Sequence, residues 1–362
     1  MKKFLLLVCV LGLQCQFLSA QTNRPFRIAI DGLTHDHVNG LFNRVSQGDL
    51  EIVGIAEPNR DLAMRYLAKF HLPVSLWYSS INELLEKVKP EAVCAFNSIA
   101  SHIFTVRACV PRGIPVMVEK PLATRLADAI EIDSLARRYQ VPVLTNYETT
   151  WYASHGLAYS LLDSVGPLRK IVVHDGHAGP REIGVSSEFF DWLTDPVKNG
   201  GGALIDFGCY GANLITWLMK GERPVSVTAI TQQIKPEIYP KVDDEATIVV
   251  TYPHSQGIIQ ASWNWPFGRK DIEIYGRTGW MMADREGLKL KSSPADTRSY
   301  PSANKTVSAQ NDPFAYLAAV VRGQVALLPG DLSSLANNLV VVAILDAARQ
   351  SAAEGRTIYL PR

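Results

Sequence analysis

The turn that follows the first apolar run has residue types that can bind a phosphate. Residues 31–37 read DGLTHDH. A dinucleotide-binding turn carries three glycines, G-x-G-x-x-G, for a tight turn, close approach of the pyrophosphate and close helix packing. Only Gly32 is a glycine here, and Thr34 and His37 occupy the other two positions. Thr34 can still offer its N–H and hydroxyl to a phosphate at a helix N-terminus. A turn that binds no nucleotide is the alternative.

An acidic residue ends the second apolar run. Glu57 lies 25 positions after Gly32, where a carboxylate can accept both ribose hydroxyls of NAD. The same carboxylate repels the additional phosphate of NADP, so NAD is favoured. Arg60 lies close enough to keep NADP as an alternative. Residues 57–59, Glu-Pro-Asn, are also suited to a simple turn and helix start.

Short apolar runs alternate with amphipathic stretches from Pro25 to Thr145. The spacing predicts strands over residues 26–31, 50–56, 92–96, 116–118 and 141–144, and helices over residues 59–70, 81–88, 99–111 and 125–139. This order indicates βαβ units with right-handed crossovers, and therefore a doubly wound parallel sheet. Ligands bind at the carboxyl edge of such a sheet, where the strands are followed by Gly32, Glu57, Asn97 and Glu119.

The pattern changes after Thr145. Residues 225–233, 245–251 and 257–265 alternate in polarity, which favours antiparallel strands with helices on one face. We therefore predict an α/β protein with a Rossmann domain over residues 24–147. An α+β domain with an open, mostly antiparallel sheet follows over residues 148–362. Because an open sheet face usually finds a partner, we expect a homodimer or homotetramer formed through this sheet.

The composition excludes several classes of protein. Lys plus Arg total 36 against 35 for Asp plus Glu, a formal charge of +1, and no basic run is present. Nucleic acid is therefore not an expected partner. No His/Cys cluster has the spacing of a zinc site, so we predict no metal.

The first twenty residues have the features of a secretory signal. Lys2 and Lys3 precede an apolar run over residues 4–13, and Ser19-Ala20 then supply small residues for cleavage. The run is too short to span a membrane in the mature protein. We expect residues 1–20 to be a signal peptide and the mature chain to be exported to the periplasm, with no membrane attachment.

One motif at the end of a predicted strand identifies a family resemblance. Residues 119–121 read Glu-Lys-Pro, and with its surroundings this motif resembles the glucose–fructose oxidoreductase / inositol dehydrogenase / MocA family. Further blocks that are similar to the family cover most of the chain after residue 20: residues 92–98 followed by His102, 200–210, 274–279, 312–314 and 347–351.

The resemblance implies a catalytic set of three residues. Lys120 would lie beside the nicotinamide and stabilise negative charge on the substrate oxygen, with a lowered pKa. Asp206 and Tyr210 are four apart in residues 203–220, which we predict to be one helix, so they share a face. The resemblance makes Tyr210 the proton-transfer residue, as in the glucose–fructose oxidoreductase and dihydrodiol dehydrogenase branches, with its pKa lowered by Lys120. Asp206 would bind substrate or position either residue. A buried structural tyrosine is the alternative.

The other expected contacts are to cofactor and substrate. The expected ligands of NAD are Gly32, Thr34, His35, Glu57, Asn97, His102 and Glu119. Asn213, His177 and Trp192 are expected to touch the substrate, although packing is the alternative for each. Glu148 stands where many relatives have Arg, which favours a substrate without negative charge.

Three functions follow from the resemblance. The first is an NAD-dependent oxidoreductase that acts on a hydroxyl of a sugar, sugar derivative or cyclitol. The second is a redox-neutral enzyme that retains NAD and cleaves glycosides by oxidation and elimination. The third is a relative that has lost its cofactor and only binds carbohydrate. We favour the first.

Overall fold

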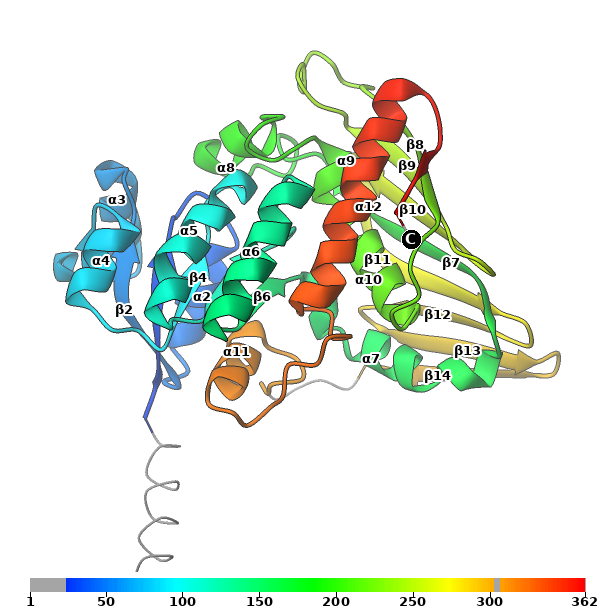
Figure 1. Ribbon diagram of the computed structural model, residues 1–362, viewed down its shortest axis with the longest axis horizontal. Helices are drawn as coiled ribbons and strands as arrows, with labels where there is room; N and C mark the ends of the chain where they lie inside the picture. The colour runs from blue at the N-terminus through cyan, green and yellow to red at the C-terminus, as the bar shows by residue number, and fades with distance from the viewer. Residues whose placement is uncertain (1–23, 303–306, 362) are drawn as a thin grey trace, which may run out of the picture.

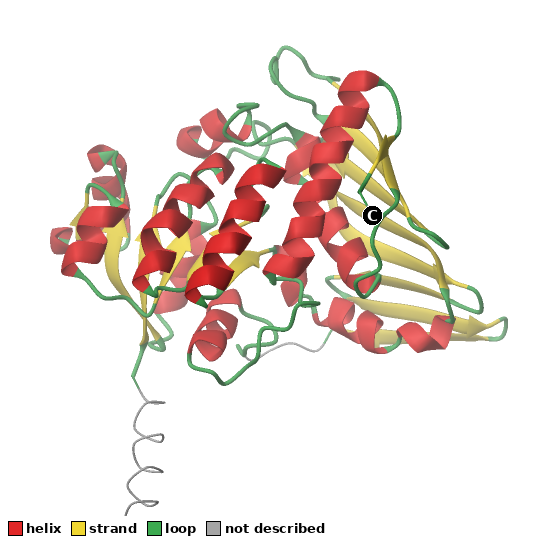
Figure 2. Ribbon diagram, viewed as in Figure 1, coloured by secondary structure: helices red, strands yellow, loops and turns green. Residues whose placement is uncertain are grey.

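The computed structural model describes residues 24–302 and 307–361. The predicted signal peptide lies outside these residues. Two sheets lie side by side in the molecule, and helices cover both faces of the first and one face of the second (Figures 1 and 2). Among the described residues, no helix is both long and apolar enough to cross a membrane.

The first sheet is a parallel Rossmann sheet of six strands in the order β3-β2-β1-β4-β5-β6. Its strands are β1 (Phe26–Asp31), β2 (Leu50–Ala56), β3 (Trp77–Tyr78), β4 (Ala92–Ala95), β5 (Val116–Glu119) and β6 (Val143–Asn146). Its helices are α2 (Val38–Val45), α3 (Arg60–Lys69), α4 (Ile81–Lys87), α5 (His102–Cys109) and α6 (Leu126–Tyr139). The central strands are buried on both faces, as a doubly wound sheet requires.

The prediction of strands in this sheet was wrong by more than one residue at two places. The predicted run over residues 141–144 starts and ends two residues before β6. It starts early because the Val141 N–H donates to the Ala136 carbonyl and so closes α6. β3 was missed because its two residues are too few to carry a periodic pattern.

The second sheet has nine strands in the order β14-β13-β12-β11-β7-β10-β9-β8-β15. All pairs are antiparallel except β7 with β10, so the predicted fold class is confirmed. The strands are β7 (Leu168–Ala178), β8 (Ser226–Gln232), β9 (Glu245–Thr251), β10 (Gln256–Ser262), β11 (Asn264–Gly276), β12 (Trp280–Asp284), β13 (Gly287–Ser293), β14 (Asp296–Pro301) and β15 (Ile358–Tyr359).

Helices cover one face of the second sheet and leave the other open (Figure 2). The covering layer contains α10 (Gly208–Leu218) and α12 (Leu335–Glu354), whose apolar residues share one core with the sheet. α7 (Ala153–Ser160) packs at the end near β12 and β13, and α11 (Pro313–Val321) packs against the first domain. The open face carries Ile230, which is 70% exposed.

The predicted helix over residues 203–220 is wrong, because the chain breaks at Phe207. α9 (Ala203–Asp206) and α10 are separate helices. The Asp206 carbonyl accepts from Lys120 Nζ at 3.0 Å and from Cys209 Sγ at 3.3 Å, and the Tyr210 N–H donates instead to the Phe207 carbonyl. Asp206 and Tyr210 therefore do not share the face of one continuous helix.

Candidate active site

The turn after β1 is held against the turn after β4. Gly32 has φ +84°, and a Cβ atom on it would lie 2.6 Å from Asn97 Cβ. Only glycine fits a positive φ and so close an approach. The Asn97 side-chain N–H donates to Asp31 at 3.2 Å and to Thr105 at 3.1 Å. Its buried Oδ1 has no partner among the described residues, which leaves one acceptor for a ligand at this edge.

Glu57 supports the same turn from β2. Its Oε2 accepts from the Leu33 N–H and its Oε1 from the Asn59 N–H, both at 2.8 Å. Burial raises the pKa of this carboxyl group. Because a carboxylate has about four acceptor positions, Glu57 can still receive ribose hydroxyls.

The two histidines assigned to the cofactor are both buried. His35 stacks on Phe189 with ring centroids 4.4 Å apart, and its Nε2 has no partner among the described residues. His102 Nδ1 lies 3.2 Å from the Leu122 carbonyl, so His102 braces the turn after β5. Burial lowers the pKa of His102 to about 4, and that of His35 well below its ordinary value, so both are neutral.

Glu119 ends β5 and is fixed by two side chains. It lies 2.9 Å from His37 Nδ1 and accepts from Asn146 Nδ2 at 2.9 Å. Burial opposes its ionisation, but His37, Asn146 and Lys120 together outweigh burial and lower its pKa. Potential ligand atoms of His35, His37 and Glu119 lie within 4.8 Å of one another. Hydrogen bonds within the protein already use the His37–Glu119 pair and His35 Nδ1, and the absence of a metal stays a prediction.

Lys120 forms a buried ion pair with Asp206. The peptide bond from Lys120 to Pro121 is cis. Lys120 Nζ donates to the Asp206 carboxylate, whose other oxygen accepts from Trp263 Nε1 at 2.9 Å. The two side chains are 6% and 9% exposed. The expected lowering of the Lys120 pKa is wrong: burial acts to lower this pKa, but the charge and hydrogen bond of Asp206, together with Cys209 and Glu119, outweigh burial and raise it.

Tyr210 lies between two lysines. Its ring centroid is 5.2 Å from Lys120 Nζ and 4.6 Å from Lys270 Nζ, and it meets Tyr147 edge-on at 5.5 Å. The expected lowering of the Tyr210 pKa is also wrong. Burial raises this pKa well above its usual value, and Glu148 raises it further. Tyr210 is therefore protonated at neutral pH.

Two charged residues of the cluster were missed in the sequence. Lys270 of β11 bonds Glu148 at 2.5 Å, and Glu148 also accepts from Tyr152 at 2.7 Å. Asp175 of β7 pairs with Lys270 in the strand register, so both side chains lie on one face of the sheet. Asp175 is fully buried, and neither carboxyl oxygen has a partner among the described residues. A single carboxylate in a strand, here between His174 and Gly176, carries no signal of its own in a single sequence.

The three residues expected to touch substrate lie in different places. His177 packs edge-on against Phe207, the residue after Asp206, with ring centroids 4.7 Å apart, so it belongs to the cluster. Asn213 does not: it is fully buried and donates to the Leu332 carbonyl at 2.9 Å, a packing role between α10 and the segment before α12. Trp192 donates to the Thr34 carbonyl at 3.1 Å and so contacts the first turn.

The residues at the carboxyl edge of the first sheet fit a dinucleotide. Gly32 and Asn97 leave no room for a side chain between the turns. Asn97 Oδ1 and His35 Nε2 are buried and have no partner in the part of the chain that the structure describes. Glu57 lies directly after β2. These are the groups that would hold NAD, with Lys120 at the end of β5 beside the second domain.

Comparison with known families agrees with this geometry. Residues 26–147 match the oxidoreductase family with an NAD-binding Rossmann fold, and residues 163–282 match the GFO/IDH/MocA C-terminal domain. The chain belongs to the Gfo/Idh/MocA family of oxidoreductases.

Two similar proteins are a dehydrogenase and a reductase by name. The chain is 26% identical over 186 residues to a trans-1,2-dihydrobenzene-1,2-diol dehydrogenase of Xenopus tropicalis, covering 50% of this chain and 52% of that protein. The chain thus spans about half the length of this curated relative. It is 25% identical to a dTDP-3,4-didehydro-2,6-dideoxy-alpha-D-glucose 3-reductase of Saccharopolyspora spinosa, over 66% of this chain and 68% of that protein.

Two solved structures share the fold. The aldose-aldose oxidoreductase of Caulobacter crescentus, complexed with glycerol, has a TM-score of 0.77 at 18% identity, covering 93% of this chain and 100% of that one. The inositol dehydrogenase homolog of Azotobacter vinelandii, complexed with NAD+, has a TM-score of 0.79 at 17% identity, covering 94% and 98%. At these identities the likeness establishes the fold.

Proposed function

We propose that this chain is an NAD-dependent oxidoreductase that acts on a hydroxyl, or on the corresponding carbonyl, of a sugar, sugar derivative or cyclitol. The observation that carries the proposal is the buried Lys120–Asp206 pair beside Tyr210, at the edge where Gly32 and Glu57 would hold the nucleotide. The family and the hydroxylated substrates named for the relatives support it.

The chain's own residues divide the work. When bound, NAD supplies a hydride acceptor, and its reduced form a donor. The Lys120 ammonium stabilises negative charge on the substrate oxygen. Tyr210 donates its proton to that oxygen in carbonyl reduction, and its phenolate recovers the proton in the reverse reaction. Asp206 and Trp263 hold Lys120 in position.

The charges of the site select the cofactor and the substrate. Glu57 repels a ribose phosphate, so NAD is preferred over NADP. The two lysines beside Tyr210 are each already paired with a carboxylate, Lys120 with Asp206 and Lys270 with Glu148, so neither is free to pair with an anionic substrate. A neutral polyhydroxylated substrate suits this balance better than an anionic one.

Two further features belong to the proposal. The open face of the second sheet forms a homodimer or homotetramer interface, which light scattering of the purified chain tests. Residues 1–20 direct export to the periplasm, which fractionation of cells that produce the native gene tests. A single-subunit mass in solution contradicts the first, and an unprocessed cytoplasmic chain contradicts the second.

The proposed activity is tested by mixing the purified chain with NAD+ and a panel of aldoses and inositols, and by following the fluorescence of reduced nicotinamide. We expect a signal with at least one neutral sugar or cyclitol, its loss in Lys120→Met and a large reduction in Tyr210→Phe. Saturable sugar binding with no binding of NAD+ or NADP+ contradicts the proposal and favours a carbohydrate-binding protein.

A further inference from the structure

A hollow lies at the end of α10, away from the site described above. We call it the α10 hollow, and its volume is about 420 Å³. It lies between α7, the end of α10 with the turn that follows, and the start of α12, which are close together in Figure 1. Trp217 follows Tyr210 by seven residues on α10, or about 10 Å along the helix axis. The walls of the hollow include Tyr159, Trp217, Lys220, Glu222, Arg223 and Asn337.

One wall of the α10 hollow is a pair of stacked aromatic rings. The ring centroids of Tyr159 and Trp217 are 4.4 Å apart, and the ring planes meet at 14°. Both rings pack against the core of the second domain, and both are partly exposed. The face of an aromatic ring is apolar and slightly negative, so it attracts the C–H groups on one face of a sugar ring. Cavities of this size that combine aromatic walls with a few polar groups are typical of small-molecule sites.

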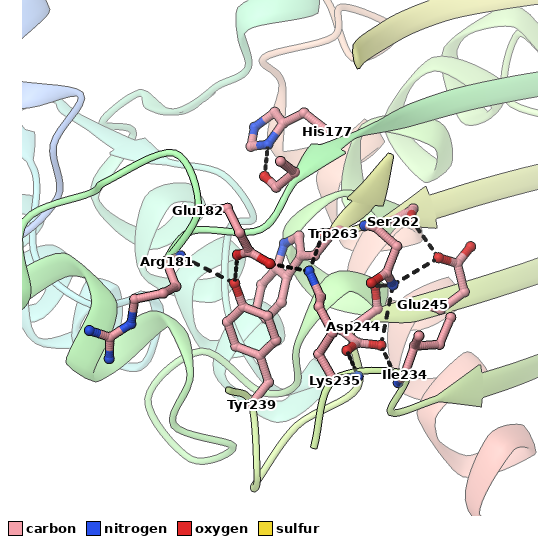
Figure 3. A network of polar contacts seen from close by, with 12 residues as sticks. His177, Arg181, Glu182, Ile234, Lys235, Tyr239, Asp244, Glu245, Ser262 and Trp263 are labelled. Carbon is pink, nitrogen blue, oxygen red and sulfur yellow. Dashed lines mark hydrogen bonds and ion pairs between the residues drawn. The ribbon is translucent and has the colours of Figure 1, made fainter. Parts of the chain in front are cut away.

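Two cations at the rim have no carboxylate partner among the described residues. Lys220 and Arg223 line the α10 hollow, and both are exposed. Figure 3 shows a lysine in the opposite situation: Lys235 Nζ bonds Glu182 and donates to the Trp263 carbonyl at 2.8 Å. The charges of Lys220 and Arg223 are therefore available to a ligand.

The remaining charges of the α10 hollow also favour an anion. Among the described residues that line it, Glu222 is the only carboxylate, against two cations. The start of α12 lies here as well, since Ala336 and Asn337 of its first turn line the hollow. The N-terminus of a long helix carries a partial positive charge, and its first N–H groups have no acceptor within the helix. A negative group in the hollow would thus be stabilised by side chains and by backbone.

The turn after α10 holds Lys220 in an uncommon conformation. Lys220 has φ +51° and Gly221 has φ +88°. The Lys220 N–H donates to the Trp217 carbonyl at 3.1 Å, and the Glu222 N–H donates to the Met219 carbonyl at 3.0 Å. A left-handed conformation crowds the Cβ atom of a lysine, whereas glycine adopts it freely. A ligand that needs the lysine charge explains why this position is not a second glycine.

We propose that the α10 hollow binds a sugar that carries an anionic substituent, either a carboxylate or a sulfate. The sugar ring packs on Tyr159 and Trp217. The anionic group binds Arg223 and Lys220, because a guanidinium donates two parallel N–H bonds to an oxyanion. This site goes beyond the proposed function, since the two lysines of the catalytic cluster are already paired and that cluster suits a neutral sugar.

The α10 hollow is tested by isothermal titration of the full chain, without nucleotide, against glucuronate, glucose 6-sulfate and neutral methyl glucoside. Arg223→Gln removes an exposed guanidinium, and Trp217→Leu removes the larger ring of the stacked pair. Arg138→Gln is the matched control, because Arg138 is an exposed arginine of α6 that lies over the Tyr139 ring. Each titration is repeated in high salt, which screens the charges at an exposed rim.

We expect the wild-type chain and Arg138→Gln to bind at least one anionic sugar with a Kd of about 1 mM, and methyl glucoside about tenfold more weakly. Arg223→Gln should weaken the binding of the anionic sugar about tenfold, and high salt should weaken it in the wild type. Trp217→Leu should lose binding of every sugar. If thermal melting shows that this variant is unfolded, Lys220→Gln at an exposed position replaces it, with the same expectation as Arg223→Gln.

Three results overturn the proposed site: equal affinities for the charged and neutral sugars, equal affinities of Arg223→Gln and Arg138→Gln, or no binding of either anionic sugar. If one anionic sugar binds and the other does not, the result supports the site and identifies its substituent. All of these outcomes are independent of the NAD-dependent activity, which stands or fails in its own assay.

Discussion

Two lysine–carboxylate pairs flank Tyr210. They contain the same kinds of charged group, but they differ in the exposure of their side chains and in the other contacts that hold them. Lys120 and Asp206 have side chains 6% and 9% exposed, and Trp263 fixes the carboxylate. Lys270 and Glu148 are 19% and 40% exposed, and their pair lies at the outer side of the cluster. Between them, Asp175 is fully buried with no partner among the described residues.

The difference in exposure predicts a different cost in stability when one partner of each pair is lost. A buried pair is strongly destabilised when one partner is lost, because the other stays charged and desolvated. A half-exposed pair is replaced by water at little cost. The Lys120–Asp206 pair is therefore the more firmly held of the two, and the Lys270–Glu148 pair is the one that water can replace.

The largest effect is expected for Lys120→Met. It leaves the Asp206 carboxylate buried without its cation, which should cost about 3–5 kcal/mol of unfolding free energy. Urea denaturation measures this cost. The double variant K120M/D206N should recover most of the loss because it removes both charges. If K120M costs no more than Lys270→Met, the two pairs are equivalent and the comparison fails.

Trp263→Phe should have the next largest effect. It removes an indole N–H bond to an ionised carboxylate, which is worth about 1.5–3 kcal/mol. Trp77→Phe is the matched control, because Trp77 Nε1 donates to the neutral Glu57 carbonyl at 2.9 Å and should cost about 1 kcal/mol. Equal losses of unfolding free energy in the two variants would show that Asp206 is not charged.

Asp175→Asn should give a smaller, pH-dependent effect. Burial raises the pKa of Asp175 well above its ordinary value, so the folded state holds this proton more tightly than the unfolded state does. The stability linked to the proton is complete below the unfolded pKa of 3.8 and is lost as pH rises through the folded pKa. As the pH rises from acid to alkaline, the unfolding free energy of the variant should therefore rise relative to that of the wild type, by about 1–3 kcal/mol. A difference in unfolding free energy that does not change with pH would refute this.

Lys270→Met should have the smallest effect on stability. Its pair with Glu148 is partly exposed, so the loss should be about 1 kcal/mol or less and should shrink further in high salt. Glu148→Gln should lose a similar amount of unfolding free energy in the same urea titrations. A loss above that of Trp263→Phe would mean that this pair is as fixed as the buried one.

The sequence predicted the fold and the composition of the site better than its electrostatics. β1 and β2 were predicted to the residue, because each is an apolar run bounded by polar turns. Lys120, Asp206 and Tyr210 are brought together as expected. The pKa directions of Lys120 and Tyr210 were wrong, because the nearest partner and the depth of burial decide them, and neither is written in local sequence.

The errors in the second domain have a similar origin. The break at Phe207 depends on Lys120, far away in the chain, taking the Asp206 carbonyl. Trp192 looked like a sugar-binding residue, yet its partner is a main-chain carbonyl of the first turn. Lys270 and Asp175 face each other only through the pairing of β11 with β7. Long-range contacts of this kind leave no periodic signal.

The most direct test of the account is to follow the hydride itself. The chain is incubated with NAD+ and with sugars and cyclitols deuterated at their carbinol carbons, and the nucleotide released on denaturation is analysed by mass spectrometry. The account predicts deuterium on the nicotinamide ring with the wild-type chain and none with Lys120→Met. A substrate that is oxidised while the nucleotide stays unlabelled, or equal labelling in the Lys120→Met chain, would contradict it.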